Sequence, residues 1–214
     1  SIDNIYIGYW IIESGQKHAF DKIDLSVIEV VKENIIVVLK TMQYQNTLEN
    51  IVRQDLFTGL NSAEYLYGQG KFKIDKFVSS TICMFKIANL EQVNKQYNRE
   101  TGNKLIIGIS NIIKERLSSE YIFVRYMGPK FEIIFIGEQT DEVTVFVQNL
   151  KNDIEEIEIE VEKANSKSKT KYINPKINFV ITTYYKGTAL ENTNKKLEEY
   201  LDNASVDEND ISFI

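Results

Sequence analysis

The order in which strand-like and helix-like segments follow one another between residues 76 and 204 places the strongest constraint on the fold. Segments rich in β-branched and aromatic residues predict strands at 76–86, 121–125, 130–136 and 177–185. The other segments predict two consecutive helices over 89–117, with a break near Thr101 and Gly102, and single helices at 141–155 and 192–204. The resulting β-α-β-β-α-β order predicts an α+β fold, a ferredoxin-like palm with an antiparallel sheet and flanking helices.

A charged segment lies between the helix at 141–155 and the last strand. Residues 156–162 alternate glutamate with apolar residues, and Lys167, Lys169 and Lys171 follow. The alternation predicts an exposed hairpin in which glutamates and lysines pair across the two strands. Each pair contributes less than about 1 kcal/mol, and the segment is a solvated surface rather than a binding site.

The N-terminal part predicts a strand at 4–13 and then a long helix at 21–54, which contains neither proline nor glycine. At 1.5 Å per residue the helix is roughly 50 Å long, with Asp21 at its N-cap and Asp24 in its first turn. Apolar residues follow heptad spacing at Ile28, Val31, Ile35, Val38, Met42 and Val52. We expect a homodimer through this helix; the alternative is a helix that packs along its own domain.

Composition excludes some classes of function. The chain has 214 residues and a formal net charge of −6, without the basic excess of a protein that binds nucleic acid. Its one cysteine, Cys83, cannot form an intrachain disulfide, which fits a reducing compartment. No apolar run reaches the ~18 residues of a membrane span. We therefore expect a cytoplasmic protein without a membrane span in this chain, or the cytosolic part of a membrane-associated parent.

Three motifs follow one another at fixed spacing. Residues 55–60 read Asp-Leu-Phe-Thr-Gly-Leu, residues 125–131 read Arg-Tyr-Met-Gly-Pro-Lys-Phe, and the segment 86–103 keeps the skeleton Ile87, Asn94, Tyr97 and Gly102. Together they resemble the GGDEF (diguanylate cyclase) domain, from Asp55 to about Ala204. The strand, acidic turn and long helix before them resemble the end of a GAF sensor domain. The predicted division is a GAF remnant at 1–20, a signalling helix at 21–54 and a GGDEF domain at 55–214.

The resemblance also implies where the chemistry of the family would lie. Its cyclases hold Mg²⁺ with the first aspartate of the central motif and the acidic pair of the hairpin, and these positions are Lys86, Pro129 and Lys130 here. The neighbouring motif positions hold Ala88, Met127 and Gly128. Near 4 Å, each carboxylate is worth about 8 kcal/mol to a divalent ion at an effective dielectric constant of 20, and a lysine is repulsive. We expect a degenerate site with no catalytic residue, no metal and no cofactor.

Two further ligand sites are implied by the resemblance. Asn94 matches the asparagine that contacts guanine, Asn103 replaces an aspartate that contacts the base, and Glu91 stands where the family has a phosphate-binding lysine. The inhibitory Arg-x-x-Asp motif becomes a segment from Ser118 to Tyr121, which lacks the guanidinium group that grips cyclic di-GMP. A weak nucleotide site at Asn94 and Asn103 therefore remains an alternative, and the inhibitory site is expected to be lost.

Three hypotheses of function follow. The first is a non-catalytic signalling or interaction module, dimeric through the long helix and attached to an upstream GAF sensor domain in bacterial cyclic di-GMP-type signalling. The second is a receptor for GTP or cyclic di-GMP that uses the old pocket. The third is an active diguanylate cyclase, which would need metal ligands from elsewhere in the chain.

Overall fold

The computed structural model describes residues 9, 11–21, 23–161, 171–205 and 210–214. By its internal contacts the chain divides into two compact units, Ser1–Ile51 and Val52–Ile214. One helix, α1 (Leu25–Arg53), dominates the first unit, and none of its residues is buried. No helix in the described part of the chain is both long and apolar enough to cross a membrane.

The start of α1 differs from the prediction. The helix begins four residues after Asp21, so Asp24 rather than Asp21 directly precedes the first helical residue. The Asp24 carboxylate accepts a hydrogen bond from the backbone N–H of Ser26 (2.9 Å), whereas Asp21 contacts His18 Nδ1 (2.8 Å). Of the strand predicted at 4–13, the described residues 9 and 11–13 are not in a strand, and the rest lies outside the described residues.

The second unit is built on a six-stranded sheet with the order β1-β3-β4-β2-β7-β8. Its four central strands are antiparallel neighbours: β3 (Ile122–Met127), β4 (Lys130–Phe135), β2 (Ser79–Ile87) and β7 (Ile177–Tyr185). The short strands β1 (Asn61–Ser62) and β8 (Asp210–Phe213) extend the two edges in parallel with β3 and β7. This confirms the ferredoxin-like palm and adds one strand at each edge.

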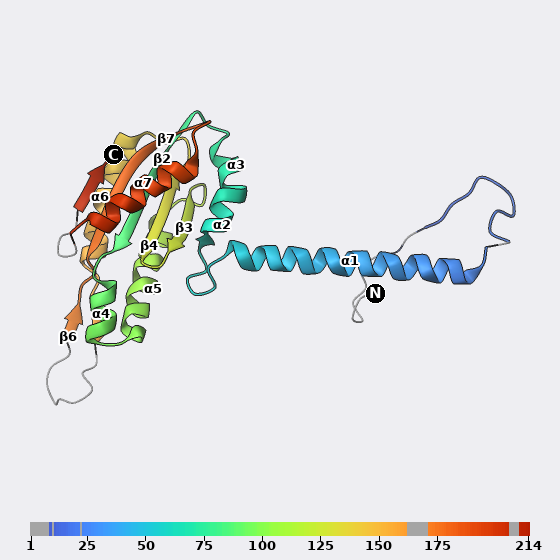
Figure 1. Cartoon of the computed structure of the whole chain (residues 1–214), viewed down its shortest axis with the longest axis horizontal. Coiled ribbons are helices and arrows are strands. Elements are labelled where there is room, and N and C mark those ends of the chain that lie inside the picture. The colour runs from blue at the N-terminus through green and yellow to red at the C-terminus, as the bar shows by residue number, and fades with distance from the viewer. Residues whose placement is uncertain (1–8, 10, 22, 162–170, 206–209) are drawn as a thin grey trace. The chain divides into compact units, whose positions relative to one another are not determined.

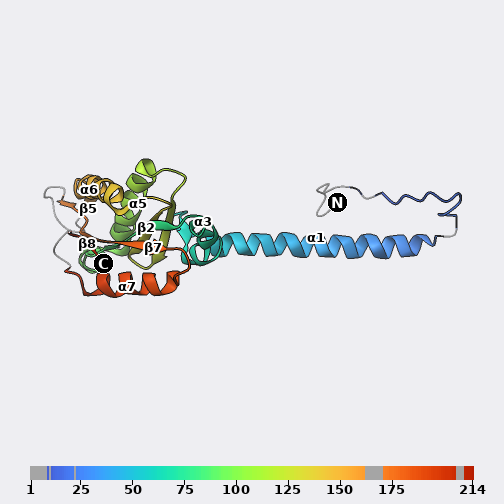
Figure 2. The same ribbon diagram turned by 90° about the horizontal axis from the view of Figure 1, so that it is seen from above.

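Helices cover both faces of this sheet (Figures 1 and 2). One face carries α4 (Leu90–Gln96), α5 (Arg99–Arg116) and α6 (Thr140–Glu155). The other face carries α7 (Leu190–Asn203), α2 (Ala63–Tyr65), a π-helical segment at Leu66–Gly70 and α3 (Lys71–Ile74). The sequence prediction left residues 63–75 and β8 without any element.

Each face of the sheet has its own apolar core. Under α5 and α6, the ring of Phe85 stacks on that of Phe131 with centroids 5.1 Å apart. Under α7, Leu190, Leu197 and Leu201 are fully buried in a second core. Each buried leucine contributes about 1.5–3 kcal/mol, so α7 is firmly attached to the sheet.

Two local predictions need correction. The break between the paired helices lies at Tyr97–Asn98, before Thr101, because the Asn98 side chain caps α5 by accepting a hydrogen bond from Thr101 N (2.8 Å). The predicted charged hairpin is present as β5 (Ile159–Val161) and β6 (Lys171–Ile173). However, Glu160 lies opposite Tyr172 and Val161 opposite Lys171, so neither is a Glu–Lys pair; Lys167 and Lys169 lie outside the described residues.

Candidate functional site

A cavity of about 430 Å³ lies where the end of β2, the helices α4 and α5 and the β3–β4 hairpin meet. Seven of the residues that the sequence analysis assigned to the metal and nucleotide sites line it: Lys86, Ala88, Glu91, Asn94, Asn103, Gly128 and Pro129. Arg99 and Arg125, which the sequence analysis did not assign to the site, also line it. The charged residues that line the cavity are thus Lys86, Arg99, Arg125 and Glu91.

The hairpin turn closes one side of the cavity. Gly128 has a positive φ of 57°, a conformation that glycine adopts without strain. The carbonyl of Pro129 accepts a hydrogen bond from Ile87 N (3.0 Å), which fixes the turn to the end of β2. Met127 does not line the cavity, and 62% of its surface is exposed.

Lys86 and Lys130 form a cationic pair on the face of the sheet that α7 covers. They are directly opposite each other in the β2–β4 ladder. Lys130 Nζ binds Glu198 Oε1 (3.0 Å) and Asp202 Oδ2 (2.8 Å), and Lys86 Nζ binds Asp202 Oδ1 (3.1 Å). Like charges opposite each other in a sheet destabilise it, so the two carboxylates of α7 are needed to neutralise this pair of lysines.

Burial and ion pairing shift the pKa values of Lys130 and Asp202 in opposite directions. Lys130 is only 8% exposed, and burial alone would lower the pKa of its ammonium group. The hydrogen bonds to Asp202 and Glu198 outweigh burial and raise that pKa. The hydrogen bonds from Lys130 and Lys86 lower the pKa of Asp202. Lys130 and Asp202 thus stay ionised near neutral pH.

The two asparagines lie on the helical side of the cavity. Asn94 packs against Gly102, where a Cβ atom would lie 2.0 Å from Asn94 Oδ1, so this close approach depends on the glycine. Asn94 Oδ1 is buried and has no hydrogen-bond partner among the described residues. Asn103 lines the same cavity from the first turns of α5.

The motif at residues 55–60 is fastened to the hairpin strand. The Asp55 carboxylate accepts hydrogen bonds from Thr58 N (2.8 Å), Thr58 Oγ1 (2.6 Å) and Arg125 Nη1 (3.1 Å). The Arg125 guanidinium also lies over the ring of Phe57, 5.2 Å from its centroid. This ion pair joins the start of the domain to a residue that lines the cavity.

The segment at the implied inhibitory site is a turn before β3. The backbone N–H of Tyr121 donates to the carbonyl of Ser118 (3.2 Å), and the Tyr121 hydroxyl donates to Glu138 Oε1 (2.7 Å). Burial, then the bond to Glu138, raises the pKa of Tyr121 to about 12. Neither Ser118 nor Tyr121 lines the 430 Å³ cavity.

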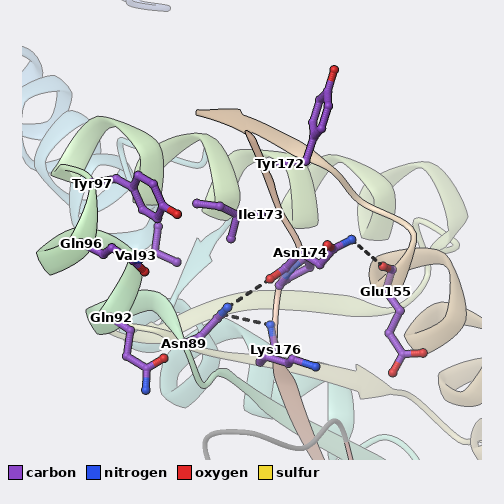
Figure 3. A pocket seen from close by; sticks show the side chains of 11 residues that line it. Asn89, Gln92, Val93, Gln96, Tyr97, Glu155, Tyr172, Ile173, Asn174 and Lys176 are labelled. Atoms are coloured by element: carbon purple, nitrogen blue, oxygen red, sulfur yellow. Dashed lines mark hydrogen bonds between the residues drawn. The ribbon is translucent and has the colours of Figure 1, made fainter. Parts of the chain in front are cut away.

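A second cavity, of about 610 Å³, lies between α4 and the segment that joins β6 to β7 (Figure 3). Asn89 spans its floor, donating to the carbonyl of Asn174 (3.1 Å) and accepting from Lys176 N (3.0 Å). Asn174 in turn donates to the carbonyl of Glu155 (3.3 Å). These amides hold the loop in place, so they serve the structure of the cavity rather than a ligand.

Comparison with known proteins identifies the family. Residues 52–209 match the family described as "Diguanylate cyclase, GGDEF domain". The chain belongs to the GGDEF domain family. The matched region of this GGDEF domain contains the hairpin, the 430 Å³ cavity and α7, whereas most of α1 precedes it.

The relatives are distant. The uncharacterized protein YtrP of Bacillus subtilis is 20% identical over 156 residues, which are 69% of this chain and 27% of YtrP. The chain therefore spans about a quarter of the length of this curated relative. The coiled coil and GGDEF domain of Caulobacter crescentus DgcB, solved with c-di-GMP, matches with a TM-score of 0.70 at 12% identity, covering 88% of this chain and all of that one (100%).

A third similar structure is that of a complex with a partner protein. The diguanylate cyclase SiaD of Pseudomonas aeruginosa, solved in complex with its activator SiaC, matches with a TM-score of 0.65 at 14% identity. The match covers 89% of this chain and 73% of SiaD. At such identities these structures establish the fold only.

Proposed function

We propose that this chain is a non-catalytic GGDEF module that relays a signal through protein contacts in cyclic di-GMP-type signalling. The observation that supports this proposal is the pair of lysines, Lys86 and Lys130, at positions where the family has metal-binding carboxylates. Both lysines are tied to α7 by salt bridges of 2.8–3.1 Å. They are part of the packing of the domain.

The residues present do not fit a magnesium ion. Mg²⁺ requires hard oxygen ligands, and it is usually held by carboxylates together with phosphate oxygens. Among the residues that the structure describes, no group of three or more His, Cys, Asp or Glu side chains is placed to hold a metal. Asp202 and Glu198 are the nearest acids to the lysine pair, and both are bound by it.

The hairpin supports the same proposal. Pro129 has no backbone N–H, so this position cannot donate to a phosphate group. Its carbonyl is held by Ile87, which leaves the turn little freedom to rearrange around a ligand. Since phosphoryl transfer depends on positioning and on metal neutralising the charge of the triphosphate, neither requirement is supplied here.

The test is turnover of GTP by the full chain. Incubation with GTP and either Mg²⁺ or Mn²⁺ is expected to give no cyclic di-GMP above a protein-free blank. An active diguanylate cyclase under the same conditions serves as the positive control. Product formed in proportion to protein concentration would contradict the proposal.

We further propose that α1 pairs with a second copy and connects the domain to an upstream GAF-type sensor. Five residues of the predicted stripe are exposed in the single chain: Val31, Ile35, Val38, Met42 and Val52, at 40, 38, 56, 54 and 55%. A coiled coil would bury them, at about 25 cal/mol per Å² of apolar surface. The DgcB structure, described as a coiled coil and GGDEF domain, matches 88% of this chain.

Charge introduced into the stripe tests this pairing. The full chain is expected to have the mass of a dimer in light scattering, and the double variant Val31→Glu, Val38→Glu the mass of a monomer. The matched control is Val30→Glu, Val37→Glu, two exposed valines outside the stripe, which should stay dimeric. Equal masses for the stripe variant and the control would refute pairing through this stripe.

A second candidate, a nucleotide receptor, is favoured by one observation. Asn94 Oδ1 is a buried acceptor without a partner among the described residues, and Asn94 lines the cavity with Asn103 and Arg99. A guanine base has N–H donors that would satisfy such an acceptor. Calorimetric titration with GTP and with cyclic di-GMP, without metal, decides between the two: heat that Asn94→Ala abolishes would support the receptor, and no heat would exclude it.

A further inference from the structure

Glu132 is a carboxyl group buried within the sheet face that α7 covers. It is 0% exposed. Its Oε2 accepts one hydrogen bond, from Asn194 Nδ2 of α7 (3.0 Å), and its Oε1 is buried without a partner among the described residues. Asn194 Oδ1 is a second buried acceptor without a partner. Two buried acceptors in this layer therefore have no donor among the described residues.

The charged and titratable groups around Glu132 come from every neighbouring element. From β4 comes Lys130 and from α7 come Glu198 and Asp202; Lys130 Nζ makes its ion pairs with these two carboxylates. From β2 comes Lys86, bound to Asp202; the buried thiol of Cys83 lies in the same strand but belongs to the core on the other face of the sheet. The hydroxyls of Tyr67 and Tyr126, which bond each other at 2.7 Å, complete the set from the π-helical segment and β3.

These neighbours do not compensate a negative charge on Glu132. Tyr67 receives the other hydrogen bond of Asn194 Nδ2 (3.2 Å), and Tyr126 donates to Glu198 Oε2 (3.4 Å). An ionised Glu132 would add a third carboxylate beside Glu198 and Asp202, with a single hydrogen bond to a neutral amide. A proton on its carboxyl group would instead supply the donor that this layer lacks.

We propose that Glu132 is a proton-controlled switch: it is neutral while α7 is packed on the sheet, and its ionisation weakens the attachment of α7. The Glu132 ion would repel Glu198, the carboxylate that binds Lys130. The loss of one proton would therefore weaken the ion pairs that join β4 to α7. The proposal does not depend on whether the domain binds a nucleotide.

The direction of the effect follows from linkage. Burial, acting against the hydrogen bond from Asn194, raises the pKa of Glu132 from 4.5 to about 8. A raised pKa in the packed state means that this contribution to stability is complete below about pH 4.5 and is lost as the pH rises through about 8. Within this window, opening that exposes Glu132 becomes up to about tenfold more favourable per pH unit.

Amide hydrogen exchange of the full chain tests the proposal. Between pH 6 and 8, and after correction for intrinsic exchange rates, protection of the α7 amides is expected to fall at least about tenfold. In Glu132→Gln, which keeps the shape without the ionisation, protection should change by less than about twofold. Glu115→Gln, an exposed glutamate on α5, is the matched control and should behave as the wild type. The same fall in Glu132→Gln as in wild type would overturn the switch.

A second measurement uses the wild-type chain, so its result does not depend on whether a variant folds. In ¹³C-glutamate NMR, the Glu132 side-chain carboxyl is expected to titrate above pH 6, apart from the exposed glutamates, with the α7 resonances shifting at the same midpoint. Titration of Glu132 near pH 4.5 would contradict the proposal. So would α7 resonances whose chemical shifts do not change at the midpoint of the Glu132 titration.

Discussion

Lys130→Glu is expected to destabilise the domain by about 4 kcal/mol or more. The substitution removes the cation that Glu198 and Asp202 share and puts a carboxylate, at a side chain 10% exposed, beside both of them. Breaking a buried ion pair by removing one partner costs about 3–5 kcal/mol, and reversing the charge adds repulsion. The variant also restores the residue type that an active family member has at this position, so it would give instability rather than activity.

Urea unfolding measures this effect, with two accompanying variants. Lys130→Met keeps the length of the side chain and removes only the charge, and it should cost less than Lys130→Glu, because it adds no repulsion. Adding Glu198→Lys to Lys130→Glu reverses the pair and should recover part of the loss, a coupling that a double-mutant cycle isolates. A Lys130→Glu chain within about 1 kcal/mol of wild type would show that the salt bridges to α7 carry little of the stability.

Asp55→Ala is expected to cost about 3 kcal/mol, because it removes the acceptor for Thr58 and the partner of Arg125 together. Burial alone would raise the pKa of Asp55, but the hydrogen bonds from Thr58 and Arg125 outweigh it and lower that pKa. The contribution of Asp55 is therefore present above its unfolded pKa of 3.8 and disappears as the pH falls through the lower folded value.

Thermal unfolding at pH 7 and pH 3 checks both parts of this prediction. The difference between wild type and Asp55→Ala should be large at pH 7 and smaller at pH 3. Asp55→Asn keeps an acceptor oxygen without the charge and should fall between the two. A loss that is the same at both pH values would mean that packing, and not the ionised carboxylate, explains the cost.

The central fold could be predicted because its strands carry their own signal. β7 matches the predicted 177–185 exactly at both ends, and α6 begins one residue before the predicted 141. The helix break was misplaced because Gly102 looks like an interruption, whereas its role is to let Asn94 approach. The signal that identifies the true break is Asn98 three residues before Thr101, an N-cap pattern.

The segments that the sequence missed have weak local patterns. Residues 63–74 form three very short helical pieces in succession, and two glycines within them argue against a helix. β8 is stabilised by pairing with β7 rather than by its own composition. Such elements depend on contacts with distant residues, which propensity does not report.

The site was predicted in part for a similar reason. Seven residues of the predicted sites line one cavity, because they lie on adjacent ends of β2, α4, α5 and the hairpin. The role of α7 was not foreseen, since Glu198 and Asp202 are 68 and 72 residues away from Lys130. The available signal was Lys130 and Glu132 at alternate positions of a strand that is buried throughout. Charges on such a strand require partners from elsewhere in the fold.

The proposed non-catalytic domain is expected not to bind a divalent ion beside a triphosphate. Electron paramagnetic resonance of Mn²⁺ with GTP, titrated with the full chain, measures this directly. We predict a spectrum identical to that of Mn²⁺ and GTP in buffer at every protein concentration, while an active GGDEF cyclase immobilises the ion. A saturable change at one ion per chain would contradict the account.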